Sequence, residues 1–199
     1  MASFDFRADH ILENERVMLR PLAESDFENL LPYSLHQPEI WKYSLVQPIG
    51  EEALRDYLKK ALTARKAEKE YPFVVFDKQT GAYAGSTRFY EMDLANPSLH
   101  LGYTWYGKQY HGTGLNKHCK FLLLSFAFET IGVERVEFQA DARNERSIAA
   151  MKSIGCVVEG ILRSSGPIAG GLRRDSIVLS ILKEEWLGGV KENLRKKLT

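Results

Sequence analysis

The sequence has little cysteine: Cys119 and Cys156 are the only two among 199 residues. Two isolated cysteines cannot build a disulfide framework, and they lack the ligand spacing of a zinc site. We therefore expect no structural or catalytic metal. Neither thiol has the sequence context of an activated nucleophile, so both are predicted to be buried core thiols.

Long hydrophobic runs are also missing. The densest run, residues 121–128, is far too short to span a bilayer, and the N-terminal MASFDFRADHILENER has early acidic residues and no signal-peptide core. We expect a cytoplasmic protein without a membrane partner. An excess of one charge is missing as well, because 27 Lys and Arg against 26 Asp and Glu leave a net charge of +1. That balance argues against a dedicated nucleic-acid binder.

The residues that are present suit one globular domain, residues 1–199, since 44% are hydrophobic and no repeat or linker interrupts the chain. A helix is expected to start at Ser25, with Glu28 as its capping-box partner, and Gly132 is expected to end a later helix. The patterns predict a mixed α/β (α+β) fold. Strands are expected over residues 16–20, 72–76, 82–90, 99–105, 133–140, 156–162 and 173–182, and helices over 25–33, 51–69, 115–131, 145–154 and the C-terminus.

Residues 107–118, GKQYHGTGLNKH, form a glycine-rich, basic bend between an aromatic strand and an apolar helix. The first turn of a helix carries unpaired N–H groups and a partial positive charge, and glycines let the backbone approach a phosphate. Lys108, Lys117 and Lys120 are expected to add positive charge. The stretch matches neither the P-loop pattern nor the Rossmann G-x-G-x-x-G pattern, so a nucleotide-binding enzyme is not favoured.

Residues 109–114 instead read Q-x-x-G-x-G, followed by DARNERS at 141–147, MKSIG at 151–155 and EG at 159–160. With the strand order, these elements make the chain resemble the GNAT family of acetyl-CoA-dependent N-acyltransferases, and most closely the branch of ribosomal-protein N-terminal acetyltransferases. The resemblance runs from RVMLRPL to SILKEEW. It implies a mostly antiparallel sheet of six to seven strands flanked by helices, with a V-shaped splay between central strands, and acetyl-CoA (coenzyme A) as co-substrate.

The resemblance also implies roles for single residues. A backbone N–H of the strand 103–105 would polarise the thioester carbonyl, and the loop 109–114 would wrap the pyrophosphate. Asn144 would hold the pantetheine or the acceptor, unless it only caps a helix, and Ser147 would donate to the departing thiolate. The implied cofactor-binding residues are Tyr103, Thr104, Trp105, Gln109, Tyr110, His111, Gly112, Thr113, Gly114, Asn116, Lys117, Asn144 and Ser147. Asn116 and Lys117 have two interpretations, contact with phosphate or exposure to solvent.

Three aromatic residues, Tyr33, Trp41 and Tyr43, would line the acceptor pocket or pack in the core. His100 stands where relatives of this branch often carry a glutamate that would act as general base. An imidazole can also accept a proton near neutral pH, so His100 is a candidate catalytic residue. The other interpretation is a half-exposed strand residue that moves no proton.

The function implied is transfer of an acetyl group to a primary amine, on a peptide N-terminus or a small molecule, by direct attack in a ternary complex. About a tenth of an α-amine is neutral at pH 7, against about one lysine in several thousand, so a site without the glutamate fits an α-amine slightly better. The alternative is a catalytically weak or inactive acyl-CoA-binding or interaction module of the same fold. A homodimer is compatible with the sequence, which does not specify the oligomeric state.

Overall fold

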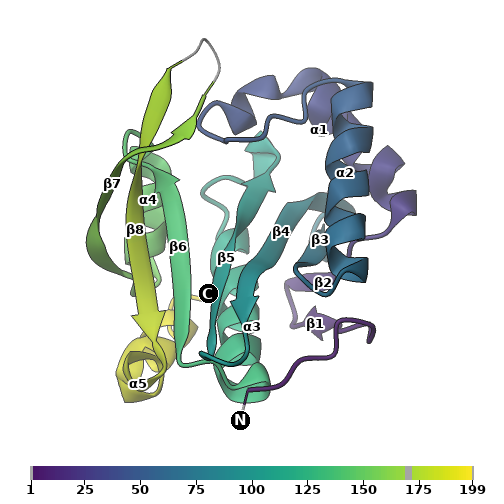
Figure 1. Ribbon diagram of the computed structural model, residues 1–199. Helices are drawn as coiled ribbons and strands as arrows, with labels where there is room; N and C mark the ends of the chain where they lie inside the picture. Colours follow the sequence, from purple (N-terminus) through teal and green to yellow (C-terminus); the bar gives the residue numbers. More distant parts are fainter. Residues whose placement is uncertain (1, 169–171, 199) are drawn as a thin grey trace.

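The computed structural model describes residues 2–168 and 172–198, where eight strands form one sheet in the order β1-β2-β3-β4-β5-β6-β8-β7 (Figure 1). All neighbouring strands pair antiparallel except β5 and β6, which are parallel. The strands are β1 (Leu12–Glu13), β2 (Val17–Pro21), β3 (Tyr71–Asp77), β4 (Ala82–Asp93), β5 (Ser98–Tyr106), β6 (Arg135–Asp141), β7 (Val157–Pro167) and β8 (Arg173–Leu182). The predicted mostly antiparallel mixed sheet is confirmed.

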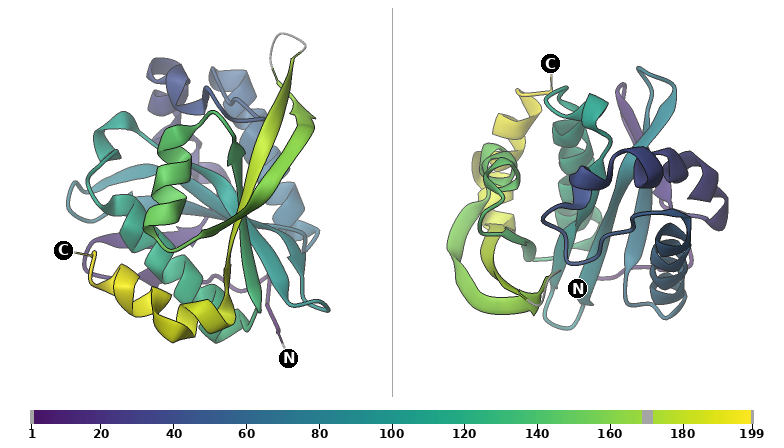
Figure 2. Two further views of the ribbon diagram at one scale, coloured as in Figure 1. Left: turned by 90° about the vertical axis from the view of Figure 1, so that its left-hand side faces the viewer. Right: turned by 90° about the horizontal axis from the view of Figure 1, so that it is seen from above.

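The helices lie on both faces of the sheet. In Figures 1 and 2, α1 (Phe27–His36) and α2 (Glu51–Lys66) lie together on one face, and α3 (Leu115–Ser125) and α4 (Glu145–Ser153) lie on the other. A π-helical stretch, Phe126–Ile131, continues α3. Near the C-terminus, α5 (Lys183–Glu185) and α6 (Lys191–Arg195) are joined by residues Trp186–Val190. None of the helices within residues 2–168 and 172–198 is long and apolar enough to cross a membrane.

One face of α2 is buried, with the spacing of an amphipathic helix. Leu54, Tyr57, Leu58 and Ala61 are buried there, at the i, i+3, i+4 and i+7 positions of one helical face. They join a core that extends over both sides of the sheet, where β3 is buried along almost its whole length. Burial on both faces explains why β3 reads as a continuous apolar run rather than as an alternating one.

The two central strands separate after a short contact. Residues Ser98–His100 of β5 pair with residues Arg135–Glu137 of β6, and no further residue of β5 is paired with β6. Beyond that point β5 stays on β4 while β6 stays on β8, which opens a wedge between them. The expected V-shaped splay between central strands is therefore present.

Several sequence expectations need correction. The sheet has eight strands instead of six or seven, because the two-residue β1 is too short to carry a periodic signal. The helix near residue 25 does not start at Ser25. Asp26 caps this turn instead: it is fully buried, accepts a hydrogen bond from the Ala23 amide at 2.9 Å and is paired with Arg20 at 2.6 Å. The ion pair with Arg20 fixes Asp26, which the capping-box pattern could not indicate.

One predicted helix end agrees with the structure, and two boundaries nearer the C-terminus differ from it. Gly132 ends the long helix with φ +83°, as predicted from its position after the apolar run. The C-terminal helix is interrupted at Gly189, whose φ is +145°. The predicted glycine-rich loop after residue 162 begins later than expected, because β7 continues to Pro167. The remainder of that loop, residues 169–171, lies outside the described residues.

Candidate active site

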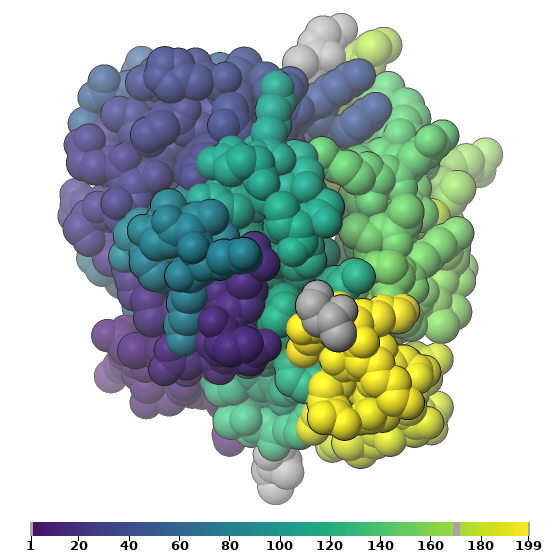
Figure 3. Space-filling model, turned by 180° about the vertical axis from the view of Figure 1, so that it is seen from behind, coloured from purple at the N-terminus to yellow at the C-terminus, as the bar shows by residue number. Residues whose placement is uncertain are grey.

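A cavity of about 570 Å³ follows the wedge between β5 and β6. Its walls come from the glycine bend, β5, β6, the start of α4, and the segment 40–46 that follows α1. Seen from behind, the teal surface near the start of α3 and the green surface of α4 lie side by side (Figure 3). Segments that are far apart in the sequence thus line one continuous cavity.

The glycine bend supplies one end of this cavity. Gly112 and Gly114 have φ values of +76° and +86°, which residues with a side chain adopt only with strain. No heavy atom lies within 4 Å of the place where a Cβ would be on either glycine. Gly114 is the N-cap of α3, so the first turn of that helix faces the same space. An anionic group can therefore approach these backbone amides closely.

Arg146 and His111 close the bend toward α4. His111 Nε2 donates to the carbonyl of Tyr106 at 3.0 Å, and Arg146 Nη1 donates to His111 Nδ1 at 2.8 Å, when the imidazole is neutral with its hydrogen on Nε2. Burial and the Arg146 charge lower the pKa of His111, which favours that neutral form. The hydrogen bond to His111 holds the guanidinium of Arg146 at the cavity wall that Gly112 and Gly114 also line.

The predicted cofactor residues of the bend fall into two groups, those that line the cavity and those that hold the bend. Tyr110, Asn116 and Lys117 line the cavity with His111 and the two glycines. Thr113 is not among the lining residues, and its hydroxyl donates to the Tyr110 carbonyl at 2.9 Å. Gln109 also lies outside the lining, with its amide Nε2 3.5 Å from the Tyr33 hydroxyl. The structure therefore gives Thr113 and Gln109 contacts that hold the bend itself.

The strand β5 has a bulge in the middle of the cavity wall. Ser86 pairs with Trp105 and Arg88 pairs with Gly102, so Thr87 alone faces both Tyr103 and Thr104. Tyr103 has φ +49°, which is uncommon for an aromatic residue. A bulge of this kind redirects backbone and side-chain groups. Tyr103, Thr104 and Trp105 all line the cavity, as the sequence indicated.

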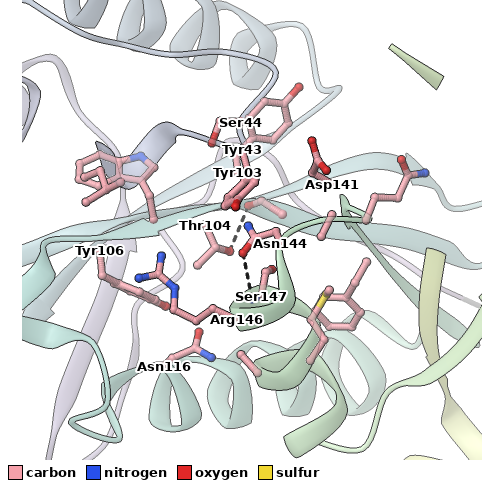
Figure 4. A pocket seen from close by; sticks show the side chains of 18 of the residues that line it. Tyr43, Ser44, Tyr103, Thr104, Tyr106, Asn116, Asp141, Asn144, Arg146 and Ser147 are labelled. Atoms are coloured by element: carbon pink, nitrogen blue, oxygen red, sulfur yellow. Dashed lines mark hydrogen bonds between the residues drawn. The ribbon is translucent and has the colours of Figure 1, made fainter. Parts of the chain in front are cut away.

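Asn144 and Ser147 lie on the opposite wall, at the start of α4. Asn144 Oδ1 accepts a hydrogen bond from the Ser147 amide at 3.2 Å, so Asn144 is the N-cap of this helix. Figure 4 shows Thr104 on one wall and Asn144 with Ser147 on the other. Capping does not exclude a role toward a ligand, since both side chains also line the cavity.

The other end of the cavity is aromatic. Trp41 and Tyr43 line it, and Figure 4 shows Tyr43 and Ser44 at the end away from Asn116. Tyr33 is not among the lining residues. Its hydroxyl donates to the Tyr83 carbonyl at 2.5 Å and its ring packs on Trp105 at 5.8 Å, so Tyr33 is a core residue behind the wall.

His100 also lies outside the lining of the cavity. It stands on β5 where the strand still pairs with β6, with Nε2 3.5 Å from Glu137 Oε1 and its ring 5.0 Å from the ring of Tyr90. Burial opposes ionisation of Glu137, but hydrogen bonds from Arg135 and Gln139 outweigh it and lower the pKa of Glu137. Of this group only Tyr90 and Gln139 reach the cavity, so any proton path from His100 is indirect.

Several charged residues that line the cavity were given no role from the sequence. Arg146 is hidden in an ordinary helical first turn, and Arg174 is a strand residue 30 positions from Asn144. Arg174 is only 7% exposed, and its Nη1 donates to the Tyr43 carbonyl at 3.1 Å. Asp141, at the end of β6, is held by Arg143 Nη2 at 2.7 Å. The DARNERS segment was the one signal that located Asp141 and Arg146 near the site.

The basic residues of the bend do not form one patch. Lys108 is paired with Glu39 on the surface, whereas Lys120 is buried on α3 with its amine in the wedge. Cys119 and Cys156 are free and buried, and burial raises the pKa of each to about 12, so both are inert core thiols as predicted. Within residues 2–168 and 172–198, no group of three His, Cys, Asp or Glu side chains could hold a metal ion.

Comparison with known proteins gives consistent matches over most of the chain. The family described as acetyltransferase (GNAT) domain matches residues 16–157. The chain is 26% identical over 180 residues to YdaF of Bacillus subtilis (strain 168), whose name proposes a ribosomal N-acetyltransferase, and the match covers 88% of this chain and 96% of YdaF.

Solved structures of acetyltransferases are also similar to the chain. A proposed acetyltransferase from T. thermophilus is similar with a TM-score of 0.86 and 34% identity, covering 100% of both chains. The microcin C7 self immunity acetyltransferase MccE, solved in complex with acetyl-CoA and AMP, shares the fold with a TM-score of 0.76 and 20% identity, covering 85% of this chain and 93% of MccE.

Proposed function

The chain belongs to the GNAT family of acetyltransferases and is an N-acetyltransferase, and we propose that it transfers the acetyl group of acetyl-CoA to a primary amine by direct attack in a ternary complex. The observation that carries the proposal is the continuous cavity of about 570 Å³. It has a glycine cradle at one end, an aromatic pocket at the other, and the β5 bulge between them. Both reactants can therefore meet at the bulge.

The glycine end of the cavity fits coenzyme A. Gly112 and Gly114 leave open space where side chains would stand, and the first turn of α3 presents amides to it. Arg146 and Lys117 line the same space and would attract phosphate. These residues would hold the pyrophosphate, and the unpaired edges of β5 and β6 would hold the pantetheine arm.

Acetyl-CoA supplies an activated acyl group as a thioester. The backbone N–H groups of Tyr103–Trp105 are the donors that would polarise the thioester carbonyl, because the bulge turns this part of β5 toward the cavity. Ser147, on the facing wall, would donate its hydroxyl hydrogen toward the sulfur. Asn144 fixes the first turn of α4 and so fixes Ser147.

The acceptor enters beside Trp41, Tyr43 and Tyr103. Because His100 lies outside the cavity lining, an acceptor that needs little help from a base is favoured. An α-amine has a pKa of about 7.7–8.0, so it loses its proton far more easily than a lysine side chain. The name of YdaF refers to a ribosomal substrate, and we propose the N-terminus of a protein or peptide as the acceptor.

The second candidate is a catalytically weak acyl-CoA-binding module of the same fold. A specific observation favours it: the imidazole of His100 faces Glu137 and Tyr90 instead of the cavity. The two candidates share the coenzyme A site. They differ only in whether a bound thioester is consumed.

Thiol release separates the two candidates. The protein is incubated with acetyl-CoA and, separately, with peptides of free N-terminus, single amino acids, polyamines and aminoglycosides, while free coenzyme A is measured. We expect release with α-amine peptides. If coenzyme A raises the melting temperature but no acceptor releases thiol, the binding module is favoured. If coenzyme A leaves the melting temperature unchanged, the cofactor site is wrong.

A further inference from the structure

Lys120 is a buried lysine whose amine faces the wedge between β5 and β6. The residue is 5% exposed and belongs to the lining of the cavity, together with Thr104 on β5 and Phe138 on β6. Its Nζ donates to Thr104 Oγ1 at 2.9 Å and lies 5.8 Å from the ring centre of Phe138. The amine is thus held beside the bulge, where the proposed carbonyl donors Tyr103–Trp105 lie.

The hydroxyl groups of Thr104 and Thr87 are compatible with only one direction of the hydrogen bond between Lys120 and Thr104, in which Lys120 is the donor. Thr104 Oγ1 is 2.7 Å from Thr87 Oγ1, and each of the two hydroxyls lies 3.4 Å from the Gly102 carbonyl, to which either can donate. In both arrangements Thr104 Oγ1 accepts from Lys120, because an ammonium group can only donate. The remaining hydrogens of the ammonium group are free to face the cavity.

Lys120 has no acidic partner in the described part of the chain. The titratable groups that act on it are the thiols of Cys119 on α3 and Cys156 before β7. Both thiols are neutral near pH 8, because burial raises the pKa of each to about 12. An unpaired buried cation is costly, so a lysine at such a place is unexpected in a site that needs no charge there.

The charged groups across the cavity are engaged elsewhere. Asp141 on β6 is held by Arg143, Arg146 on α4 donates to His111, and Arg174 on β8 donates to the Tyr43 carbonyl. Burial lowers the pKa of Lys120 to about 8. That value is close to neutral pH, and a general acid works best when its pKa lies near the operating pH.

We propose that Lys120 is a catalytic residue, whose ammonium group beside Thr104 gives the proton that the departing coenzyme A sulfur takes up. The inference rests on the proposed function. Lys120 moves one proton from Nζ to the sulfur while the carbon–sulfur bond breaks with its electron pair on sulfur, and the acceptor nitrogen bonds to the acyl carbon. The acylated nitrogen loses one proton to solvent, and Lys120 regains one from solvent. Ser147 orients the sulfur by a hydrogen bond and transfers no proton.

Two variants and one control test the assignment by kinetics. Lys120→Met removes the ammonium group and keeps an unbranched side chain of similar length, and Lys120→Arg keeps the charge but gives up no proton near neutral pH. Lys60→Met, on the exposed side of α2, is the matched control. We expect both Lys120 variants to lower kcat about 10²-fold at pH 7, with KM for acetyl-CoA changed less than about threefold. The wild-type kcat should fall above pH about 8, and Lys120→Met should lack this fall.

A second readout needs no acceptor. The thiol of bound coenzyme A is titrated by the ultraviolet absorbance of its thiolate, as the difference between complexes with coenzyme A and desulfo-coenzyme A. The Lys120 ammonium should make the bound thiol ionise at lower pH than in free coenzyme A. In Lys120→Met the thiol should ionise as in free coenzyme A or at higher pH.

The outcomes distinguish this inference from the proposed function. If the wild type acetylates an acceptor, and Lys120→Met has the same kcat and its bound thiol ionises at the same pH as in the wild type, Lys120 is not the acid and the proposed function stands. If the thiol shifts but no acceptor is acetylated, the place of Lys120 is supported and the proposed function fails. If mass spectrometry finds Lys120 itself acetylated in stoichiometric yield, the amine is an acceptor and the inference is overturned. If coenzyme A does not bind, both fail.

Discussion

The guanidinium carbon of Arg88 lies 4.3 Å from the ring centre of Tyr103, and Arg88 Nη1 donates to Glu70 Oε2 at 2.5 Å. Arg88 is 4% exposed and pairs with Gly102 next to the β5 bulge. The left-handed backbone of Tyr103 is thus held from one side by a buried cation. A support of this kind matters if the amides of the bulge polarise a carbonyl, because their direction depends on the backbone of Tyr103.

We therefore expect Arg88→Met to lower both stability and turnover. Loss of the cation–π contact and of the pair with Glu70 should cost roughly 1–3 kcal/mol in the free energy of unfolding. Relaxation of the bulge should lower kcat about tenfold. Arg55→Met is the control, because Arg55 also lies over a ring, Phe27, and pairs with an acid, Glu51, but away from the cavity. Equal kcat in the two variants would limit Arg88 to a stabilising role.

Gly112 is expected to be essential for binding coenzyme A. Glu at this position places a carboxylate in the space where the phosphates would lie, so the shift in melting temperature on adding coenzyme A should disappear. The matched control is Gly81→Glu in the β3–β4 turn. Gly81 also has a positive φ, +65°, and open space around its Cβ position, so the backbone strain is similar. A thermal shift that survives in Gly112→Glu would contradict the cradle.

Much of this site could be predicted because glycines and caps act locally. The Q-x-x-G-x-G bend and the Asn144 cap depend on the backbone of a few consecutive residues, so the sequence located them correctly. Arg174 and Lys120 could not be found in this way. Each reaches the cavity only because the sheet brings distant segments together, and Lys120 looked like one of several lysines near a basic bend. For Tyr33 the sequence left two interpretations, because its aromatic neighbourhood is compatible with either core or pocket, and the fold places it behind the cavity wall.

His100 tests how the acceptor loses its proton. We expect His100→Gln to lower kcat about tenfold with a lysine-like acceptor and less with an α-amine peptide, because much of the α-amine is already neutral near pH 8 and needs no base. The affinity for coenzyme A, measured by calorimetry, should not change, since His100 lies outside the cavity lining. His36→Gln at the exposed end of α1 is the control. Unchanged turnover with both acceptors would remove His100 from the mechanism.

The burial of Lys120 leads to a prediction about the stability of the protein that is independent of any ligand. Burial lowers its pKa to about 8 from an ordinary value of 10.5, so the unfolded chain binds this proton more tightly than the folded chain. The penalty is fully present below pH about 8, on the order of 3 kcal/mol, and it fades as the pH rises toward 10.5.

Lys120→Met removes this penalty but also the hydrogen bond to Thr104, worth about 1 kcal/mol. We expect the variant to be about 2 kcal/mol more stable than the wild type at pH 7. Above pH 8 the difference should shrink, because the wild type loses its buried charge while the variant has none to lose. Urea unfolding at a series of pH values, with Lys60→Met beside it, measures this difference. A difference that does not depend on pH would mean that the wedge hydrates the Lys120 ammonium, and the amine would then be an ordinary lysine, too weak an acid to protonate a thiolate.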